Sequence, residues 1–484
     1  MNVIKRTQLS RKRIGKAVLK SGFLLLAGDL TLEQAVGAPE NHTTIHQAAA
    51  DQALDLAEKS IALRSVAGLG NQTPDVASLF RDALIKGGIA PSDITITPYK
   101  DTAYLIARWP GQDPSLKPLV ISGHMDVVEA KASDWTHDPF KPQIENGYLL
   151  GRGSTDMKLD DTLAIAALLE LKREGYKPRR DIILEFSGDE ETTMATGAII
   201  ADKLSNAELV LNMDGANGTL SEKTGKPDYF TWEGAEKNYA DFRLTVTNPG
   251  GHSSEPRPVN AIDELAADLL RIQQHRFKPE VNELSRSYFQ NAARWQKPEM
   301  AAAMKAFAKN PADEKAILTL SSDPSYIGRI GTTCVVTMID GGHALNALPQ
   351  KVTANINCRI FPGHPRAAIM EELRKAAQDP SMKIEDATEG SVQTAASPMR
   401  SDVVKAIEHG MQVAYPGVAV FPALSSGASD SMWFRSHGVP SYGISPIFIK
   451  NSDSFMHGLN ERTPVASIAP ALEDLLVIIP DLSH

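Results

Sequence analysis

Hydrophobic residues in the first half of the chain follow two alternating patterns, one typical of amphipathic helices and one of short buried strands. Helical spacing occurs first, for example at Leu54, Ala57 and Ile61, and compact apolar runs follow it. Strands that alternate with helices indicate a largely parallel sheet with helices on both faces. The predicted elements are, in order, helices at 51–64 and 75–86, strands at 94–99, 103–108 and 118–122, a helix at 157–174, a strand at 182–186, a helix at 195–204 and a strand at 209–213.

The pattern changes near residue 235. Apolar and polar residues then alternate, with Phe242, Leu244 and Val246 on one side, which indicates a strand with one solvated face. The predicted order from here is strand, helix, strand, strand, helix and strand, which is that of the ferredoxin-like split unit. These elements are a strand at 240–247, a helix at 260–275, strands at 332–339 and 352–360, a helix from Pro365, as its first residue, to 377, and a strand at 382–385.

The segment 277–326 lies inside this second unit but is polar, partly helical and without a strand pattern. We expect it to be an insertion that enlarges the unit. After about residue 398 the first pattern resumes, with helices at 403–414 and 431–436, a strand at 440–444 and a helix at 465–479. The sequence therefore predicts an α/β fold whose mainly parallel sheet domain is interrupted by a ferredoxin-like α+β domain. The predicted divisions are a leader at 1–40, the large domain at 41–235 and 395–484, and the smaller domain at 236–394.

The first 40 residues differ from the rest of the chain. A basic start that includes Lys5, Arg6 and Arg11 precedes an apolar stretch at 22–28 and small residues at 35–38. This order resembles an export signal, and it predicts a protein exported to the periplasm or the cell exterior. A disordered basic tail on a cytoplasmic protein is the alternative.

Composition excludes several classes of function. The net charge of -9 argues against a nucleic-acid partner, because phosphate binding needs a basic face. No apolar stretch reaches the roughly 18 residues of a membrane-spanning helix. The two cysteines, Cys334 and Cys358, are too few for a disulfide framework. They lie on two strands of a predicted hairpin, so they could pair in an exported protein.

Residues suited to metal binding follow three successive predicted strands. His124 follows the first of these strands, Glu190 and Glu191 follow the second, and Asp214 follows the third. The carboxyl ends of parallel strands meet at one edge of a sheet, where ligands bind in open α/β folds. Imidazole and carboxylate ligands without thiolates suit zinc, manganese or cobalt at a hydrolytic site.

Three further residues complete the candidate set. Asp156 lies just before a predicted helix, where a role as N-cap is the alternative. Asp126, two residues after His124, could accept the proton of one imidazole nitrogen while the other nitrogen faces a metal. His457 supplies a second histidine near the C terminus. Two divalent cations would balance three of these carboxylates and a bridging hydroxide.

A series of short motifs contains these residues and continues to the C terminus. The motifs are His124-x-Asp126, Gly153-Ser154-Thr155-Asp156-Met157-Lys158, Asp189-Glu190-Glu191, Asp214, Gly250-Gly251-His252-Ser253-Ser254, Asn346-Ala347-Leu348-Pro349, Cys358-Arg359, Gly427-Ala428-Ser429-Asp430 and His457. In this order they resemble the co-catalytic zinc metallopeptidase family, which includes glutamate carboxypeptidase, carboxypeptidase S, carnosinase, aminoacylase and succinyl-diaminopimelate desuccinylase. The resemblance runs from about Ala50 to the C terminus.

The resemblance implies two zinc ions per subunit, for which cobalt or manganese could substitute. His124 and Asp214 would hold one ion, Glu191 and His457 the other, and Asp156 would bridge them. The peptide bond from Asp156 to Met157 is expected to be cis. Asp126 would orient His124, and Glu190, kept off the metals, would be the general base.

The resemblance also assigns roles to the smaller domain, which would act as a lid and as a surface for homodimer formation. His252 would stabilise the oxyanion, in some members from the partner subunit, and its alternative role is that of a turn histidine that caps a helix. Arg359 would pair with a substrate carboxylate, helped by Asn346 and the amides around Gly427. A surface ion pair is the alternative for Arg359.

The implied reaction is hydrolysis of an amide bond that releases an amino acid from a small peptide. Family peptidases tend to have aspartate at the position of Asp214, so a carboxypeptidase or dipeptidase is favoured over the alternative, an N-acyl amino acid hydrolase. A catalytically inactive binding module is disfavoured because every ligand and Glu190 are present. An aminopeptidase is disfavoured because Arg359 and Asn346 suggest carboxylate recognition.

Overall fold

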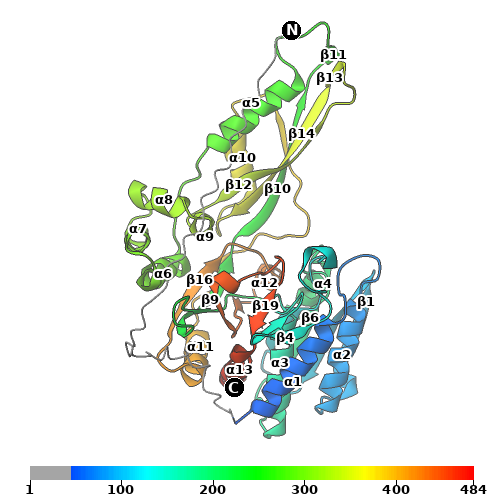
Figure 1. Ribbon diagram of the computed structural model, residues 1–484, viewed down its shortest axis with the longest axis vertical. Coiled ribbons are helices and arrows are strands. Elements are labelled where there is room, and N and C mark those ends of the chain that lie inside the picture. The colour runs from blue at the N-terminus through cyan, green and yellow to red at the C-terminus, as the bar shows by residue number, and fades with distance from the viewer. Residues whose placement is uncertain (1–44) are drawn as a thin grey trace, which may run out of the picture. The chain divides into compact units, whose positions relative to one another are not determined.

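The computed structural model describes residues 45–484, so the predicted leader lies outside the described residues. Within these residues the chain forms one large sheet, one four-stranded sheet and two small sheets (Figure 1). No helix between residues 45 and 484 is both long and apolar enough to cross a membrane.

The large sheet has the strands with the candidate ligands near its centre. β3 (Leu119–His124) lies between β6 (Ile182–Ser187) and β7 (Leu209–Asn212), and it is parallel to both. Their carboxyl ends therefore meet at one edge, and the predicted α/β class is confirmed. The order is β1-β2-β6-β3-β7-β17-β9-β8-β18 with β16 paired to β9, where the other strands are β1 (Ile94–Tyr99), β2 (Thr102–Trp109), β8 (Gly218–Leu220), β9 (Pro227–Glu236), β16 (Ala419–Ser425), β17 (Ser441–Gly443) and β18 (Phe448–Lys450).

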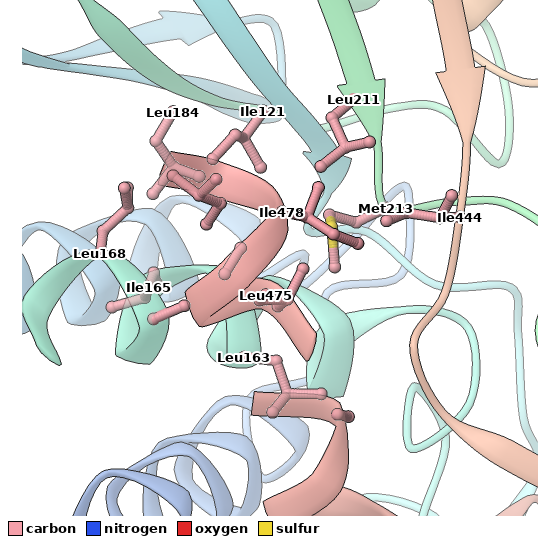
Figure 2. Packing of buried hydrophobic residues seen from close by; sticks show 14 of the residues in the cluster. Ile121, Leu163, Ile165, Leu168, Leu184, Leu211, Met213, Ile444, Leu475 and Ile478 are labelled. Carbon is pink, nitrogen blue, oxygen red and sulfur yellow. The ribbon is translucent and has the colours of Figure 1, made fainter. Parts of the chain in front are cut away.

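Helices cover both faces of this sheet because successive side chains of a strand point to opposite faces. Ile121 of β3 belongs to one core, and its neighbour Val120 belongs with Phe434 to another. Figure 2 shows the first core, to which Ile121 of β3 and Leu475 and Ile478 of the C-terminal helix belong. The first core includes α1 (Gln47–Ile61), α2 (Thr73–Lys86), α3 (Lys158–Arg173), α11 (Ser401–Ala414) and α13 (Ile468–Leu482), and the second includes α4 (Ala195–Lys203) and α12 (Ser431–Ser436).

The four-stranded sheet is antiparallel, in the order β12-β14-β10-β15. Its strands and two helices share a separate core that contains Phe242, Leu244 and Ile356. Pro365 precedes its helix as the N-cap rather than as the first residue. In chain order the elements are β10 (Asn238–Thr247), α5 (Ala261–Gln274), β12 (Thr333–Gly341), β14 (Lys351–Ile360), α10 (Arg366–Ala377) and β15 (Lys383–Asp386).

The insertion at 277–326 packs on the large sheet, so the expectation that it enlarges the smaller unit is wrong. Phe289 and Phe307 of the insertion share a core with Tyr229 of β9 and Phe421 of β16. Amphipathic helices and these two strands bury apolar surface against each other, which explains the arrangement. The helices are α6 (Glu283–Ala292), α7 (Pro298–Lys309), α8 (Glu314–Ser321) and α9 (Pro324–Ile327).

Sequence reasoning missed β9 and β16, although both belong to the large sheet. β9 contains Glu233 and Gly234, and β16 contains Pro422. These residue types are depleted in strands, so they hide the pattern. It also missed the short strands β8 and β18 of the large sheet and the strands of the two small sheets, which are β4 (Gln143–Glu145), β5 (Tyr148–Leu150), β11 (Gly251–His252), β13 (Ala347–Leu348) and β19 (Arg462–Pro464).

Candidate metal centre and active site

Three predicted ligands come together at the carboxyl-end edge of the large sheet. His124 is the last residue of β3, Asp214 follows β7, and Asp156 lies just before α3. One side-chain nitrogen or oxygen atom from each of the three lies within 4.8 Å of the others. Nε2 of His124 is 3.1 Å from Oδ1 of Asp156, so both side chains face the same point. These atoms could hold one metal ion.

Asp156 also faces a second set of predicted ligands. Its Oδ2 atom is 3.1 Å from Nε2 of His457, which is 3.0 Å from Oε2 of Glu191. Donor atoms of these three residues again lie within 4.8 Å of one another. The two oxygens of Asp156 thus face two different histidines, which suits a carboxylate that bridges two metal ions.

The charges around this centre fit a pair of divalent cations. Burial raises the pKa of Glu190 well above its usual range, and the carboxylates of Asp214 and Asp430 raise it further. Burial also raises the pKa of Asp214, and the charge of Asp156 adds to this shift. Carboxylates gathered in this way repel one another unless cations neutralise them. Nitrogen and oxygen donors without thiolate are compatible with zinc.

Asp126 supports the centre in a different way from the one predicted. Nδ1 of His124 is 3.0 Å from the main-chain carbonyl oxygen of Asp126 but 3.7 Å from its carboxylate. The carboxylate instead accepts the main-chain N–H groups of Glu190 and Glu191, each at 3.0 Å. Because β3 ends at His124, the side chain of Asp126 no longer follows the alternation of the strand. Asp126 therefore orients the histidine with its backbone and the two glutamates with its side chain.

A buried ion pair that sequence reasoning missed holds the loop before α3. Nη1 of Arg152 lies 2.5 Å from Oε2 of Glu461, and both side chains are almost fully buried. Oε1 of Glu461 accepts the N–H groups of Thr155 and Asp156 at 2.7 and 3.0 Å. The peptide bond from Asp156 to Met157 is cis, as the resemblance implies. Glu461 could not be identified from the sequence because a single glutamate in a loop resembles any surface acid.

The first cavity, of about 390 Å³, opens over the two ligand sets and is lined by Glu190, Arg359 and Gly427. The guanidinium carbon of Arg359 lies 4.9 Å from the centre of the Tyr239 ring. Burial lowers the pKa of Arg359. No carboxylate of residues 45–484 lies within 4.0 Å of its nitrogens, so the alternative of a surface ion pair is not observed in this part of the chain. Its guanidinium is available to an anion that enters the cavity.

His252 and Asn346 do not line this cavity. His252 belongs to β11, which pairs with β13, and Asn346 accepts the N–H of Ser253 with its main-chain oxygen at 2.9 Å. Figure 1 shows β11 and β13 at the end of the four-stranded sheet that lies away from the large sheet. The roles predicted for His252 and Asn346 therefore require a second copy of the chain, and they stay predictions.

Comparison with known proteins places most of the chain in one family. The family model described as "Peptidase family M20/M25/M40" matches residues 120–479, which include all the predicted metal ligands. "Probable carboxypeptidase S-like 2" of Dictyostelium discoideum is 28% identical over 377 residues, which cover 75% of this chain and 71% of the relative. "N-fatty-acyl-amino acid synthase/hydrolase PM20D1.1" of Danio rerio is 26% identical over 373 residues, which cover 73% and 70%.

The fold is also similar to that of solved structures. A metallo-carboxypeptidase of the M20 family from Sulfolobus solfataricus matches with a TM-score of 0.68 at 18% identity. The match covers 90% of this chain and 99% of the solved chain. At this level of identity the likeness concerns the fold, which supports the architecture described above.

Proposed function

Because the chain belongs to peptidase family M20/M25/M40, we propose that it is a dinuclear zinc hydrolase that releases a C-terminal amino acid from a dipeptide or small peptide. The observation that carries this proposal is the juxtaposition of two ligand sets that share Asp156. Glu190 and Arg359 line the cavity above them. A metal centre, a base and a carboxylate-binding group therefore lie together.

The metal ions would be held as the two ligand sets indicate. His124 and Asp214 would hold one ion, and Glu191 and His457 the other, with Asp156 as the bridge. When bound, zinc supplies Lewis-acid polarisation of the scissile carbonyl and lowers the pKa of a water molecule, and cobalt or manganese could substitute.

Glu190 is the residue that we assign as general base. Glu191 belongs to a ligand set, whereas Glu190 belongs to neither and lines the first cavity. The Asp126 carboxylate fixes the turn that contains both residues. Glu190 can therefore take a proton from the attacking water and pass it to the leaving amine.

Arg359 would bind the carboxylate of the amino acid that is released. Its planar guanidinium suits a two-pronged contact with a carboxylate, and the main chain at Gly427 lines the same cavity. His252 and Asn346 would join from the partner subunit of a homodimer. In that arrangement His252 would donate a hydrogen bond to the developing oxyanion.

An N-acyl amino acid hydrolase is the second candidate, supported by the similarity to the Danio rerio relative. Both candidates use Arg359 and the metal centre in the same way. They differ in whether the acyl half of the substrate has a free amino group. Asp214 favours the peptidase, since acylases of this family tend to have glutamate at that position.

We also propose that the protein is exported. The cysteines at positions 334 and 358 form a disulfide between neighbouring strands, with their Cα atoms 4.1 Å apart. Disulfides persist mainly in oxidising compartments, which supports the export signal predicted for residues 1–40. Fractionation of cells that produce the full chain tests this, and an uncleaved protein confined to the cytoplasm would contradict it.

The test of the proposed function is amino-acid release from matched dipeptides and N-acetyl amino acids by the zinc-loaded protein, with and without a chelator. We expect release from dipeptides that the chelator abolishes. Preference for the acetylated set would move the assignment to an acylase. Absence of release from both sets by protein that holds two metal ions would contradict both candidates.

A further inference from the structure

A second cavity, of about 710 Å³, lies beside the first. The two cavities share Asp214, Gly427 and Ala428, so they meet at the candidate metal centre. One part of its wall comes from β8, β9 and β16, and another part comes from the insertion, which contributes Tyr288 and Tyr326. The insertion helices can form this wall because they pack on β9 and β16.

Arg329 provides a positive charge in the second cavity. Its guanidinium carbon lies 4.5 Å from the centre of the Tyr288 ring, a contact that helps to fix its position. No carboxylate of residues 45–484 lies within 4.0 Å of its guanidinium nitrogens. Arginine is always charged and its geometry matches a carboxylate, so Arg329 is suited to an anionic group on a ligand.

Glu233 of β9 provides the opposite charge, near the metal centre. A Cβ atom built on Gly443 would lie 3.2 Å from Cα of Gly215 and 3.4 Å from Oε2 of Glu233. Gly443 therefore lies next to both the Glu233 carboxylate and Gly215, which follows Asp214. Burial raises the pKa of Glu233 to about 7. In the part of the chain that the structure describes, no Lys, Arg or His nitrogen lies within 4.0 Å of this carboxylate.

The other carboxylates of the second cavity already have partners. Asp214 belongs to a candidate ligand set, and Glu236 pairs with Arg435 at 2.9 Å. Among residues 45–484, Glu233 and Arg329 therefore remain as two opposite charges that form no ion pair within 4.0 Å, although the charge of Arg329 lowers the pKa of Glu233. Glu233 is the nearer of the two to the metal centre. A ligand that satisfies both would have a cation near the reacting carbonyl and an anion farther away.

The position of Arg359 sets the direction in which the substrate lies. If Arg359 holds the carboxylate of the amine half in the first cavity, the acyl half extends past Asp214 into the second cavity. In a dipeptide, the α-ammonium group is one carbon away from the scissile carbonyl. The side-chain carboxylate of an acidic first residue extends farther. These positions correspond to those of Glu233 and Arg329.

We infer that the second cavity binds the acyl half of the substrate, with Glu233 paired to an α-ammonium group and Arg329 to a carboxylate. The favoured substrate class is a dipeptide with a free amino terminus and an acidic first residue. This inference rests on the proposed function, because it takes the direction of the substrate from Arg359 and the metal centre.

The test uses four alanine conjugates that differ only in the two charges of the acyl half. Glutamyl-alanine has both charges, 2-aminobutyryl-alanine only the ammonium, glutaryl-alanine only the carboxylate, and butyryl-alanine neither. We expect kcat/KM of the zinc-loaded full chain to be highest for glutamyl-alanine and lowest for butyryl-alanine. Each charge on the acyl half should raise kcat/KM about 10- to 100-fold, which is the range for a hydrogen bond to a charged group.

Two variants that each remove one of the protein's charges assign these contributions. Glu233→Gln should lower kcat/KM about 10- to 100-fold for the two conjugates with an amino group and leave the other two nearly unchanged. Arg329→Gln should lower kcat/KM by a similar factor for glutamyl-alanine and glutaryl-alanine, whose acyl halves have a carboxylate, and leave the other two conjugates nearly unchanged. Glu145→Gln and Arg276→Gln change exposed residues outside both cavities and serve as matched controls.

Metal content and the unfolding midpoint of each variant show whether the fold and the metal centre are intact. Equal rates on the four conjugates, or equal losses on all four in either variant, would overturn the inference and leave the proposed function standing. Absence of release from all four by metal-loaded wild type would overturn the proposed function, and this inference with it.

Discussion

The buried carboxylate of Glu461 connects the C-terminal segment to the loop that presents Asp156. It accepts the main-chain N–H groups of Gly153, Thr155 and Asp156 in that loop and pairs with Arg152. We expect Glu461→Gln to weaken metal binding about 10- to 100-fold, the range for residues that support metal ligands. Competition with a chromophoric chelator measures the affinity, and Glu145→Gln, which changes an exposed residue, is the control. Unchanged affinity in Glu461→Gln would show that the loop holds its shape without this contact.

Asp474 gives a prediction about pH and stability. Burial raises its pKa well above the usual value, and neither carboxylate oxygen has a hydrogen-bond partner among residues 45–484. The folded state thus keeps a proton that the unfolded state loses, so this residue makes the free energy of unfolding fall as pH rises above about 4. Where only the unfolded state is ionised, the decrease is about 1.4 kcal/mol per pH unit.

We therefore expect Asp474→Asn to be more stable than the wild type by an amount that increases from pH 5 to pH 8. Urea unfolding at several pH values measures this difference. A difference that stays constant with pH would mean that Asp474 is ionised in the folded state.

The hydrophobic pattern indicated His124, Asp156, Glu191 and Asp214 as candidate ligands because each follows a predicted strand or precedes a predicted helix. His457 lies in a turn between two short strands, so its role came only from the family resemblance. Glu461, Glu233 and Arg329 could not be identified from the hydrophobic pattern. Their positions depend on contacts with residues that are remote in sequence. Glu461 pairs with Arg152, and Arg329 lies over the ring of Tyr288. Local pattern contains no information about such contacts.

The disulfide between β12 and β14 ties the edge of the four-stranded sheet to the strand that contains Arg359. Cys334 and Cys358 face each other directly in the register of the two strands. We expect its reduction to lower the free energy of unfolding of this sheet by about 2–4 kcal/mol. Hydrogen exchange of the β12 and β14 amides, with and without reductant, measures the change. Equal protection in both states would contradict this, and a Cys334→Ser/Cys358→Ser variant, insensitive to reductant, is the control.

Strands with one solvated face were the easiest elements to predict, since β10 and β14 alternate clearly along their lengths. β9 was missed because it is buried along most of its length and contains two glutamates and a glycine. One of these glutamates is Glu233, which lines the second cavity. At this strand the residue that obscured the pattern is the one to which we assign a function.

The outer strand β12 offers a surface for a second copy of the chain. It lies at the edge of its sheet, and Val335, Met338 and Ile339 are 59%, 70% and 63% exposed. Long apolar edge strands tend to pair with other chains, whereas charged edges do not. We expect the wild type to sediment as a dimer and Met338→Lys/Ile339→Lys as a monomer.

The same variant tests whether His252 acts across the dimer. If it does, monomers of Met338→Lys/Ile339→Lys should lose as much turnover as His252→Ala while they keep their metal. A monomeric wild type with full activity would contradict both the dimer and the role of His252. The change from helices and buried strands to an alternating strand is visible in the pattern along the chain near β10. The packing partner of the insertion is not, because amphipathic helices fit any apolar surface.

In the proposed metal centre, two metal ions share Asp156 and Glu190 binds neither. Metal content by plasma mass spectrometry after zinc loading and dialysis, together with turnover, tests this arrangement in three proteins. We predict two ions per chain for the wild type, two for Glu190→Gln with kcat lowered about 100- to 10,000-fold, and fewer than one for Asp156→Asn. Loss of metal from Glu190→Gln, or two ions retained by Asp156→Asn, would show that the ligands are not divided in this way.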